Sequence, residues 1–540
     1  MNAGSAGGPA RRAVTEASGA PEARRRLVVV ADSDSYVKWG AAFATRLPAG
    51  WDAELIVVTT PVMPSDRQLG AALAGSSFHA KGVRRLDLAS LERRLAARRP
   101  DAVLLALRGP FVRVVAPIVA ALPGRPVLLS GFPGLTIPAV PKAVVYREQV
   151  DLVVLHSRRE VREFEQLAAG LGVRVGFGLA TLPFLTARRR GASPGDGDAA
   201  PVTPHVASAP VAAFASTSAS TPPDGDLVFA AQAKVPAERD DRVRMLGLLA
   251  DAARRRPTRR VVVKVRARRG EAQTHAEAHD YADLLADPEV RARLGGVPPN
   301  LVVEDGPMAK HLGRASMLVT VSSTAVLEAV AAGVPAIVVD EFGVGPKLIN
   351  TVFAGSGLFG DRAAVAEWVA KPPAEGWLVD NYFHGEAFDD WVDRLEELLD
   401  RRAAGLLPAP TRRHDLVGGA VRRAFERKRM LGPYDRSVAG ALSTIVAVPT
   451  RWALRRVRAV RRALPGGSRA GSSSAIAHAV LAGSMPADGV LTDPVRSERS
   501  VTTRPGTESI HREQGMLESM PAGEARGDAA LSDAALSDAA

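Results

Sequence analysis

The sequence has 540 residues, of which 46% are hydrophobic, and 70 lysines and arginines against 58 acidic residues give a formal net charge of +12. The length predicts about two to four domains, and the positive charge favours anionic partners such as nucleotides, polymers or lipid head groups. The chain has no cysteine, which excludes disulfides, Cys-ligated zinc and a thiol nucleophile.

Three further absences narrow the class of protein. Aromatic and basic residues do not alternate as they do in single-strand-binding proteins, so no nucleic-acid partner is expected. No apolar run approaches the roughly 18 residues of a membrane-spanning helix, and Met1–Arg26 lacks the apolar core of a signal peptide. The expected location is therefore the cytoplasm.

The first part of the chain alternates between strand-like and helix-like patterns. Residues 1–25 are predicted to be disordered, and residues 26–185 form a first α/β domain, because repeated β–α alternation indicates a parallel sheet. The predicted strands are Leu27–Ala31, Ala53–Thr59, Val83–Asp87, Ala102–Leu107, Pro126–Ser130, Leu152–His156 and Val173–Leu179. The predicted helices include Tyr36–Leu47, Leu88–Arg99, Phe111–Leu122 and Arg158–Leu171.

A linker rich in Pro, Ser, Ala and Gly occupies residues 186–225, after which the alternation resumes over residues 226–380. The predicted strands of this second domain are Leu227–Gln232, Val261–Val265, Leu301–Glu304, Met317–Val321 and Ala336–Val339. The predicted helices include Asp240–Arg255, His275–Leu285 and Pro307–Ala315. The expected fold class is α/β with two Rossmann-like domains.

Beyond the second domain, residues 381–464 predict C-terminal helices, with amphipathic patterns over Phe388–Ala403 and Arg413–Met430. Residues 437–463 combine an apolar run with arginines and suggest two interpretations: a helix on the inner face of the plasma membrane, or a solvated arginine face on a helix packed against protein. Residues 465–540 have low complexity and are predicted to be disordered.

The stretch Ala315–Gly343 carries the strongest signal for a ligand. A buried strand over Met317–Val321 leads into the hydroxyl-rich turn Ser322–Thr324, then into a helix that Gly333 and Pro335 end. A helix N-terminus at the carboxyl end of a parallel strand suits a phosphate. An ordinary helix cap is the alternative interpretation.

This stretch resembles the nucleotide-binding segment of GT-B glycosyltransferases, especially bacterial capsule-polysaccharide and CDP-glycerol-type transferases. The resemblance implies that Ser322, Ser323 and Thr324 face the donor phosphates and that Glu328 holds the ribose hydroxyls. It also implies the GT-B architecture, with the active site between the two domains and C-terminal helices that cross back to the first domain.

Other polar residues at predicted strand ends of the second domain are candidates for donor binding. Lys264 fits the family pattern, but Arg266 and Ala267 stand where the family often has His-Pro, which argues against a strict CDP-glycerol transferase. The further donor-binding candidates are Arg266, Gln232, Lys234, Asp305 and Glu341.

Metal-independent enzymes of this class generally take the general base from the first domain. Asp34 or Asp32, directly after the first strand, is the candidate base, and His156 is the alternative. The competing interpretations are a helix-capping Asp/Ser cluster and a structural histidine. Lys38 and the glycines Gly131 and Gly134 are candidates for acceptor binding.

Several motifs are missing, and their absence shapes the functional prediction. The chain has no GxGxxG after the first strand, no P-loop and no HExxH or paired Cys/His spacing, so dehydrogenase, NTPase and dedicated metal chemistry are not expected. We therefore predict a metal-independent glycosyltransferase without a cofactor, which moves a sugar from a nucleotide-activated donor to a polysaccharide or lipid-linked acceptor. The alternatives are a nucleotide-sugar 2-epimerase and a non-catalytic nucleotide-binding protein.

Overall fold

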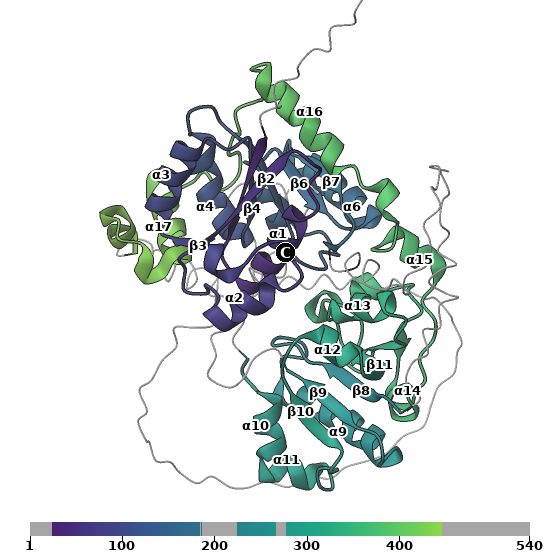
Figure 1. Cartoon of the computed structure of the whole chain (residues 1–540). Helices are drawn as coiled ribbons and strands as arrows, with labels where there is room; N and C mark the ends of the chain where they lie inside the picture. The colour runs from purple at the N-terminus through teal and green to yellow at the C-terminus, as the bar shows by residue number, and fades with distance from the viewer. Residues whose placement is uncertain (1–23, 184, 186–223, 266–276, 445–540) are drawn as a thin grey trace, which may run out of the picture.

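The computed structural model describes residues 24–183, 185, 224–265 and 277–444. These residues form two separate all-parallel β-sheets, each covered by helices, which lie one above the other in Figure 1. The predicted fold class of two Rossmann-like domains in a GT-B arrangement is thereby confirmed. The predicted linker lies almost wholly outside the described residues, as do most of residues 1–25 and all of 465–540.

The N-terminal domain is built on a seven-stranded sheet with the order β3-β2-β1-β4-β5-β6-β7. Its strands are β1 (Arg25–Ala31), β2 (Trp51–Val58), β3 (Arg84–Leu86), β4 (Ala102–Ala106), β5 (Val127–Gly131), β6 (Leu152–Leu155) and β7 (Gly176–Leu179). Its helices are α1 (Asp34–Ala44), α2 (Asp66–Leu73), α3 (Leu88–Arg98), α4 (Gly109–Ala120), α5 (Pro141–Val145) and α6 (Arg158–Leu171).

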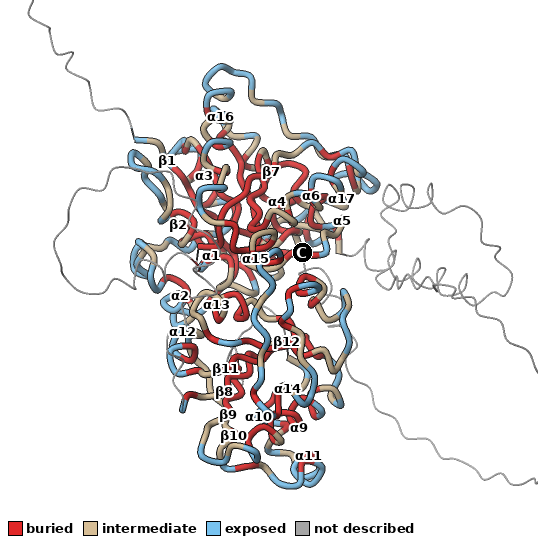
Figure 2. The backbone as a smooth tube through the Cα atoms, turned by 90° about the vertical axis from the view of Figure 1, so that its right-hand side faces the viewer, coloured by how far each residue is buried: buried red, intermediate tan, exposed pale blue. Residues whose placement is uncertain are grey.

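The central strands of this sheet are continuous apolar runs because helices cover both of their faces. One face packs against α1 and α2 through Trp39 and Phe43, and the other packs against α3, α4 and α6 through Phe111 and Phe164. Figure 2 shows the central strands of both sheets as buried, whereas the edge strand β3 and the first residues of β2 are exposed or half-buried. In register, Val29 of β1 pairs with Leu55 of β2 and with Leu104 of β4.

The C-terminal domain is built on a six-stranded sheet with the order β10-β9-β8-β11-β12-β13. Its strands are β8 (Asp226–Ala230), β9 (Val261–Lys264), β10 (Leu301–Glu304), β11 (Ala315–Thr320), β12 (Ala336–Val339) and β13 (Phe359–Gly360). Its helices are α9 (Arg239–Arg255), α10 (Tyr281–Ala286), α11 (Pro288–Arg293), α12 (Met308–Leu312), α13 (Ala325–Ala331), α14 (Arg362–Glu367) and α15 (Glu375–Asp380).

Two helices that follow the second sheet pack onto the N-terminal domain. Helix α16 (Trp391–Ala403) buries Trp391 against Phe43, with ring centroids 4.1 Å apart. Helix α17 (Gly419–Leu431) places Met430 and Leu431 in the cluster that contains α4. Among the described residues no helix is long and apolar enough to cross a membrane.

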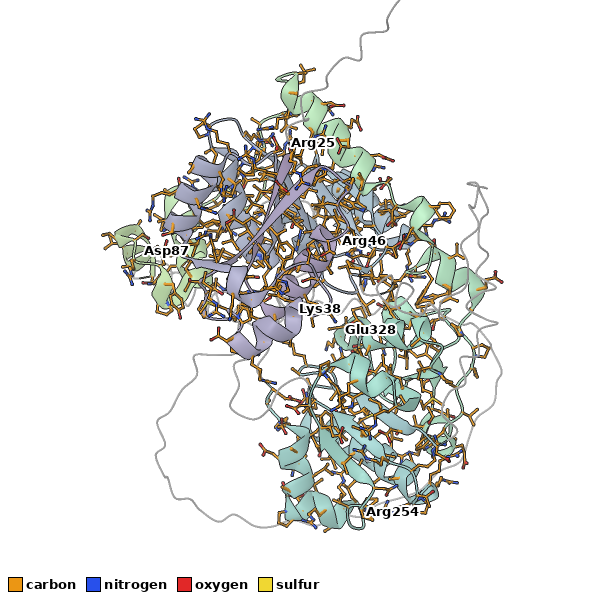
Figure 3. The ribbon with its side chains drawn as sticks, viewed as in Figure 1. Arg25, Lys38, Arg46, Asp87, Arg254 and Glu328 are labelled. Atoms are coloured by element: carbon orange, nitrogen blue, oxygen red, sulfur yellow. The ribbon has the colours of Figure 1, made fainter. Side chains whose placement is uncertain are left out.

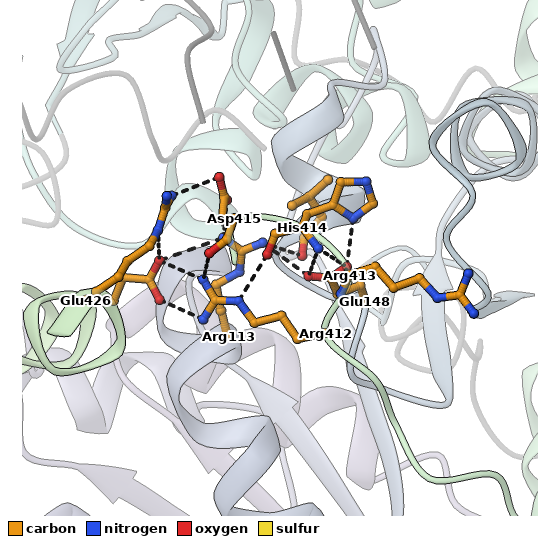
Figure 4. A network of polar contacts seen from close by, with 9 residues as sticks. Arg113, Glu148, Arg412, Arg413, His414, Asp415 and Glu426 are labelled. Atoms are coloured by element: carbon orange, nitrogen blue, oxygen red, sulfur yellow. Dashed lines mark hydrogen bonds and ion pairs between the residues drawn. The ribbon is translucent and has the colours of Figure 1, made fainter. Parts of the chain in front are cut away.

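A polar network fastens the segment before α17 to α4 and to the turn between α5 and β6 (Figure 4). Glu148 accepts hydrogen bonds from the backbone nitrogens of Arg413 and His414 and lies 2.8 Å from Nδ1 of His414. Arg113 of α4 contacts Glu148 and Asp415. Because these groups are buried or half-buried, the network fixes the path of the chain into α17.

The structure corrects several predicted element bounds. Helix α17 begins at Gly419 and not at Arg413, because Asp415 (φ 56°) and Gly418 (φ 94°) adopt left-handed backbone conformations that a helix cannot contain. Helix α10 begins at Tyr281 and not at His275, because the Asp280 side chain caps it. The predictions missed the short elements α2, α5, α11, α14, α15 and β13.

The two domains contact each other through a buried hydrogen bond and an ion pair. The hydroxyl of Tyr382, which follows α15, donates to Oε1 of Glu160 on α6 at 2.8 Å. Beside it, Arg162 makes a bidentate pair with Asp380 at 2.7 and 2.8 Å. Ile137 also packs into the apolar cluster that contains β8 and β11.

Replacement of Trp391 by alanine tests the attachment of the C-terminal helices. Trp391→Ala removes a side chain that is 2% exposed, and we expect the free energy of unfolding to fall by about 3–5 kcal/mol. Phe388→Ala is the matched control, because Phe388 is 54% exposed and its loss costs about 1 kcal/mol or less. Urea unfolding measures both, and equal effects would contradict the packing assigned to α16.

Candidate functional site

Each sheet has a topological switch point at the carboxyl edge of its central strands. In the first sheet it lies between β1 and β4, and in the second between β8 and β11. Open α/β sheets bind ligands at such points, because the loops that follow the two strands turn to opposite faces of the sheet. The residues that follow these four strands are therefore the candidates for a site.

At the second switch point, the turn after β11 is tied to the end of β8. Oε1 of Gln232 accepts hydrogen bonds from the backbone nitrogen and from the hydroxyl of Ser322, both at 3.0 Å. The backbone nitrogen of Ser323 donates to Oγ1 of Thr320 at 3.2 Å. These bonds bring two predicted donor-binding residues, Gln232 and Ser322, into direct contact.

The hydroxyl-rich turn differs in detail from the predicted helix cap. The N-cap of α13 is Thr324, whose side chain makes no capping bond, while the Ser323 hydroxyl accepts from the backbone nitrogen of Ala325 at 3.2 Å. Gly333, with φ 68°, follows the helix as predicted. Because α13 has seven residues, an anion here would depend on local hydroxyls and backbone nitrogens more than on a helix dipole.

Lys264 lies at the same edge of the sheet. It ends β9, is 9% exposed and pairs in register with Ala230 of β8. Its side chain is on the same face of the sheet as that of Val262, because side chains alternate along a strand, and Val262 packs with the residues of α13. Lys234, two residues after Gln232, is half-buried at the end of β8.

Two of the predicted donor-binding residues are not brought to this turn. Glu341 pairs with Arg362 of α14 at 3.5 Å, and Arg362 also pairs with Asp251 of α9, so Glu341 belongs to the outer helical face. Asp305 follows the edge strand β10, which is two strands from β8 and thus about 10 Å away. Arg266 lies outside the described residues.

At the first switch point, Asp32 is an internal ion-pair partner. It is 0% exposed, and its Oδ2 lies 2.8 Å from Nε of Arg108, which follows β4. The pair joins the ends of β1 and β4. A carboxylate buried in this way is poorly placed to meet a substrate, so the structure disfavours Asp32 as the general base.

Asp34 is placed differently from Asp32. It is the first residue of α1 and is half-buried. Lys38 lies four residues further on, and residues with this spacing share one face of a helix. Lys38 lies 3.9 Å from Glu328 of the C-terminal domain, so Asp34 is on the side of α1 that faces that domain, and its role as general base stays a prediction.

His156 has both ring nitrogens occupied inside the N-terminal domain. Nε2 lies 2.8 Å from Nε1 of Trp39, and Nδ1 lies 2.7 Å from the carbonyl oxygen of Ala180. An indole nitrogen can only donate, so Nε2 accepts and Nδ1 carries the proton. Burial lowers the pKa of His156 to about 4. The prediction of His156 as an alternative base is wrong, since its neutral ring is fully used in packing.

The two glycines of the predicted acceptor loop have different surroundings. A Cβ on Gly131 would lie 2.6 Å from the Trp39 ring and 2.8 Å from the carbonyl oxygen of Val154, so this glycine serves packing within the domain and not the acceptor. A Cβ on Gly134 would lie 3.1 Å from Cγ2 of Thr324. Gly134 therefore lets the loop approach the hydroxyl-rich turn of the other domain.

The carboxyl edges of the two sheets thus meet at two places, which we call the domain junction: Gly134 against Thr324, and Lys38 with Glu328. Nζ of Lys38 lies 3.9 Å from Oε1 of Glu328, and Figure 3 shows the two side chains facing each other across the boundary between the domains. Residues predicted for the acceptor side and for the donor side are here in contact.

The sequence analysis did not single out Glu160, a buried residue that hydrogen-bonds to both domains near the domain junction. Its carboxylate accepts from the backbone nitrogens of Thr136 (3.1 Å) and His156 (2.8 Å) and from the Tyr382 hydroxyl. Burial raises the pKa of Glu160, while the three donors favour its ionised form. The spacing Ser157-x-x-Glu160 at the start of α6, typical of a capping box, was the available signal.

Arg147 is a second missed residue at this edge of the first sheet. It is 0% exposed, and its guanidinium donates to the Ser130 hydroxyl at 3.1 Å and to the carbonyl oxygen of Gly131 at 3.1 Å. It also stacks on the Phe132 ring, 3.8 Å from its centroid. Burial lowers the pKa of Arg147. This side chain fixes the start of the loop that reaches Thr324.

Within the described ranges, no group of three or more His, Cys, Asp or Glu side chains is arranged to hold a metal ion.

Comparison with protein-family models shows the family of the chain. Residues 27–398 match the family described as "Putative glycosyltransferase (DUF6716)". The match includes both sheets, the domain junction and most of α16. The protein belongs to this family. A search of curated protein sequences returned no match.

Solved structures of nucleotide-sugar enzymes show a distant likeness. A "putative UDP-N-acetylglucosamine 2-epimerase" from Listeria monocytogenes has 10% sequence identity, covers 72% of this chain and 99% of its own, and gives a TM-score of 0.43. A UDP-glucosyltransferase from Polygonum tinctorium has 13% sequence identity. The match covers 71% of this chain and 100% of that one, with a TM-score of 0.41. A UDP-GlcNAc 2-epimerase from Neisseria meningitidis, bound to UDP-GlcNAc, has 10% sequence identity. The match covers 70% of this chain and 100% of that one, with a TM-score of 0.39.

The structural role of His156 predicts a specific pH dependence of stability. The folded-state pKa of about 4 lies below the ordinary value of about 6.5, so between these values the unfolded chain binds a proton that the folded chain does not. Stability is therefore lost as the pH falls, by about 2 kcal/mol between pH 7 and pH 5 from this residue. In His156→Gln this component should vanish from urea unfolding. An equal pH dependence in both proteins would contradict the assignment.

Proposed function

We propose that this protein transfers a glycosyl group from a nucleotide-activated donor to a cell-surface polysaccharide or lipid-linked precursor. The observation that carries the proposal is the domain junction, where Glu328 and Thr324 of one domain meet Lys38 and Gly134 of the other. Membership of a glycosyltransferase family gives the reaction class. The contact gives the place where donor and acceptor sides would face each other.

The donor would lie along the carboxyl edge of the second sheet. In this proposal the hydroxyls and backbone nitrogens of Ser322–Thr324 hold its phosphates, and Lys264 adds a positive charge. Glu328, one turn into α13 and 16% exposed in its side chain, accepts hydrogen bonds from the ribose hydroxyls. Gln232 is a positioning residue, because it fixes the backbone of Ser322.

Asp34 would act as the general base for transfer. Its carboxylate takes the proton of an acceptor hydroxyl while the hydroxyl oxygen forms a bond to the anomeric carbon of the donor sugar. The bond between that carbon and the phosphate oxygen breaks, and the electron pair leaves with the nucleotide phosphate. Positive charge from Lys264 and the oriented groups of Ser322–Thr324 stabilise this leaving group. No cofactor is required, and we propose that the reaction is metal-independent.

We also propose that the protein is related to the capsule-polysaccharide and CDP-glycerol-type transferases. Lys264 fits their pattern, while Arg266-Ala267 replaces their His-Pro. A glycosyl donor is therefore favoured over CDP-glycerol.

Nucleotide binding can be tested with a pair of carboxylate variants. Thermal unfolding of the protein with CMP, CDP, UDP, GDP and TDP should reveal a selective stabilisation, which reaches about 2.7 kcal/mol at 100 times the Kd. Glu328→Ala should lose most of this stabilisation, because the ribose loses its acceptor. Glu341→Ala is the matched control and should keep it, since Glu341 pairs with Arg362 away from the turn.

Stabilisation by no nucleotide would contradict the donor site, and equal loss in both variants would contradict the role given to Glu328.

Substitutions of the two aspartates that follow β1 should have different effects on the transfer rate and on the free energy of unfolding. Asp34→Asn should leave the free energy of unfolding within about 0.5 kcal/mol and lower the transfer rate by about 10²–10⁴. Asp32→Asn removes the partner of Arg108 and should cost about 3–5 kcal/mol of stability. The measurements are urea unfolding and incorporation of labelled sugar, from the donor that the nucleotide panel selects, into membrane and polymer fractions.

Normal turnover in Asp34→Asn would contradict its role as base. Conversion of the nucleotide sugar without any acceptor would identify a 2-epimerase instead of a transferase.

A further inference from the structure

Exposed apolar side chains are concentrated in one stretch of the chain. Of the ten large hydrophobic residues that are exposed in the described part of the chain, six lie between Leu416 and Leu442. They are Leu416 (58% exposed), Val417 (69%), Val421 (49%), Tyr434 (43%), Val438 (74%) and Leu442 (57%). We call them, with the basic residues among them, the α17 surface. Solvent-exposed apolar groups concentrated in this way mark an interaction site.

The α17 surface is also strongly basic. Lysine and arginine outnumber aspartate and glutamate by eight to three between Thr411 and Leu442. All three acidic side chains are used in ion pairs within the protein: Asp415 with Arg113, Glu426 with Arg412, and Asp435 with Arg427. These acidic side chains offset only part of the positive charge, because eight basic residues face three acidic ones.

Two arginines are available to a partner. Arg423 and Arg436 are exposed, and neither makes an ion pair within the described ranges. Arg436 lies close enough to Asp87, the N-cap of α3, to contribute to the lowered pKa of that carboxyl, for which the main cause is the hydrogen bond from the backbone of Ser90.

Helix α17, which carries Val421, is already packed against the N-terminal domain. Helix α17 buries Met430 and Leu431 against α4, and the polar network of Figure 4 holds the segment that leads into it. Val421 of α17 and Val417, which precedes the helix, are both exposed. The folded protein thus uses one side of α17 for packing, and the exposed apolar groups on α17 and next to it in the sequence are left to a partner.

An anionic lipid bilayer fits this surface better than another protein does. Aliphatic groups next to arginines are typical of helices that lie in a membrane interface, with the apolar side chains among the acyl chains and the cations at the phosphates. Protein interfaces are typically rich in aromatic residues, and here Tyr434 is the one aromatic member. The sequence after residue 444 continues with the same mixture of apolar residues and arginines.

We propose that the α17 surface docks the protein onto an anionic bilayer, with Val417, Val421, Val438 and Leu442 entering the interface and Arg423 and Arg436 contacting lipid phosphates. The end of α17 lies beside the carboxyl edge of the first sheet, because Gly432 contacts Pro61 directly after β2. Asp34 and Lys38 are at the same edge. Docking therefore brings that edge towards the membrane, and it does not depend on the reaction proposed above.

Vesicle co-sedimentation of the full-length protein tests the proposal. Binding to vesicles of phosphatidylcholine with phosphatidylglycerol should exceed binding to phosphatidylcholine alone and should weaken with salt. Arg423→Glu should reduce the partition coefficient by about fivefold or more, which corresponds to about 1 kcal/mol per basic residue near the surface. Arg291→Glu is the control, since Arg291 is an exposed arginine of the other domain without an ion pair among the described residues. Circular dichroism checks that each variant is folded.

A second measurement reports on contact at the surface itself. Because the chain has no cysteine, Val421→Cys carries the single thiol for an environment-sensitive dye, and Val369→Cys, at a residue 60% exposed in the other domain, is its control. Anionic vesicles should shift the emission of the dye at residue 421 to the blue and leave the dye at residue 369 unchanged.

Three outcomes would overturn the proposal. Equal binding to neutral and anionic vesicles would contradict the proposed contact between the arginines and lipid phosphates. Binding that Arg423→Glu leaves intact, with no shift at residue 421, would assign the membrane contact to another part of the chain. Self-association in analytical ultracentrifugation that Val421→Asp abolishes, without vesicle binding, would assign the surface to a second copy of the protein.

Discussion

The buried carboxylate of Glu160 is the group on which the arrangement of the two domains depends. It accepts one hydrogen bond from the loop that carries Gly134, one from the backbone at the end of β6, and one from Tyr382 of the other domain. Without its donors this carboxylate would carry a large desolvation cost. The N-terminal loop, helix α6 and the segment after α15 must therefore keep one relative position, and that position brings Gly134 against Thr324 and Lys38 to Glu328.

This constraint separates neighbouring residues into different roles. Asp32 and Asp34 are two residues apart, yet one is sealed between β1 and β4 with Arg108 and the other begins α1 on the face that leads to Lys38. In the same way, Glu328 reaches the domain junction while Glu341 is held by Arg362 on the outer helical face. Burial and partners, more than residue type, decide which carboxylates can meet a substrate.

The sequence was sufficient to predict the two parallel sheets, because continuous apolar runs such as Ala102–Ala106 alternate with helical periodicity. It also placed Gln232 and Ser322 at one sheet edge, since Gln232 ends one predicted strand and Ser322 follows another, and the two residues are in contact. The environment of Gly131 could not be predicted, because it depends on Trp39, which is far away in the sequence. For the same reason His156 was misjudged: its partners Trp39 and Ala180 come from other elements. Short elements such as β13 carry too few residues for a periodic signal.

Hydrogen–deuterium exchange with and without the nucleotide that stabilises the protein most is the most direct test of the central claim, that the two sheet edges form one site. We predict that the nucleotide slows exchange in the backbone segment 321–328 and, across the domain junction, in segments 33–38 and 132–136. Protection confined to other regions, with these three segments unchanged, would contradict the account.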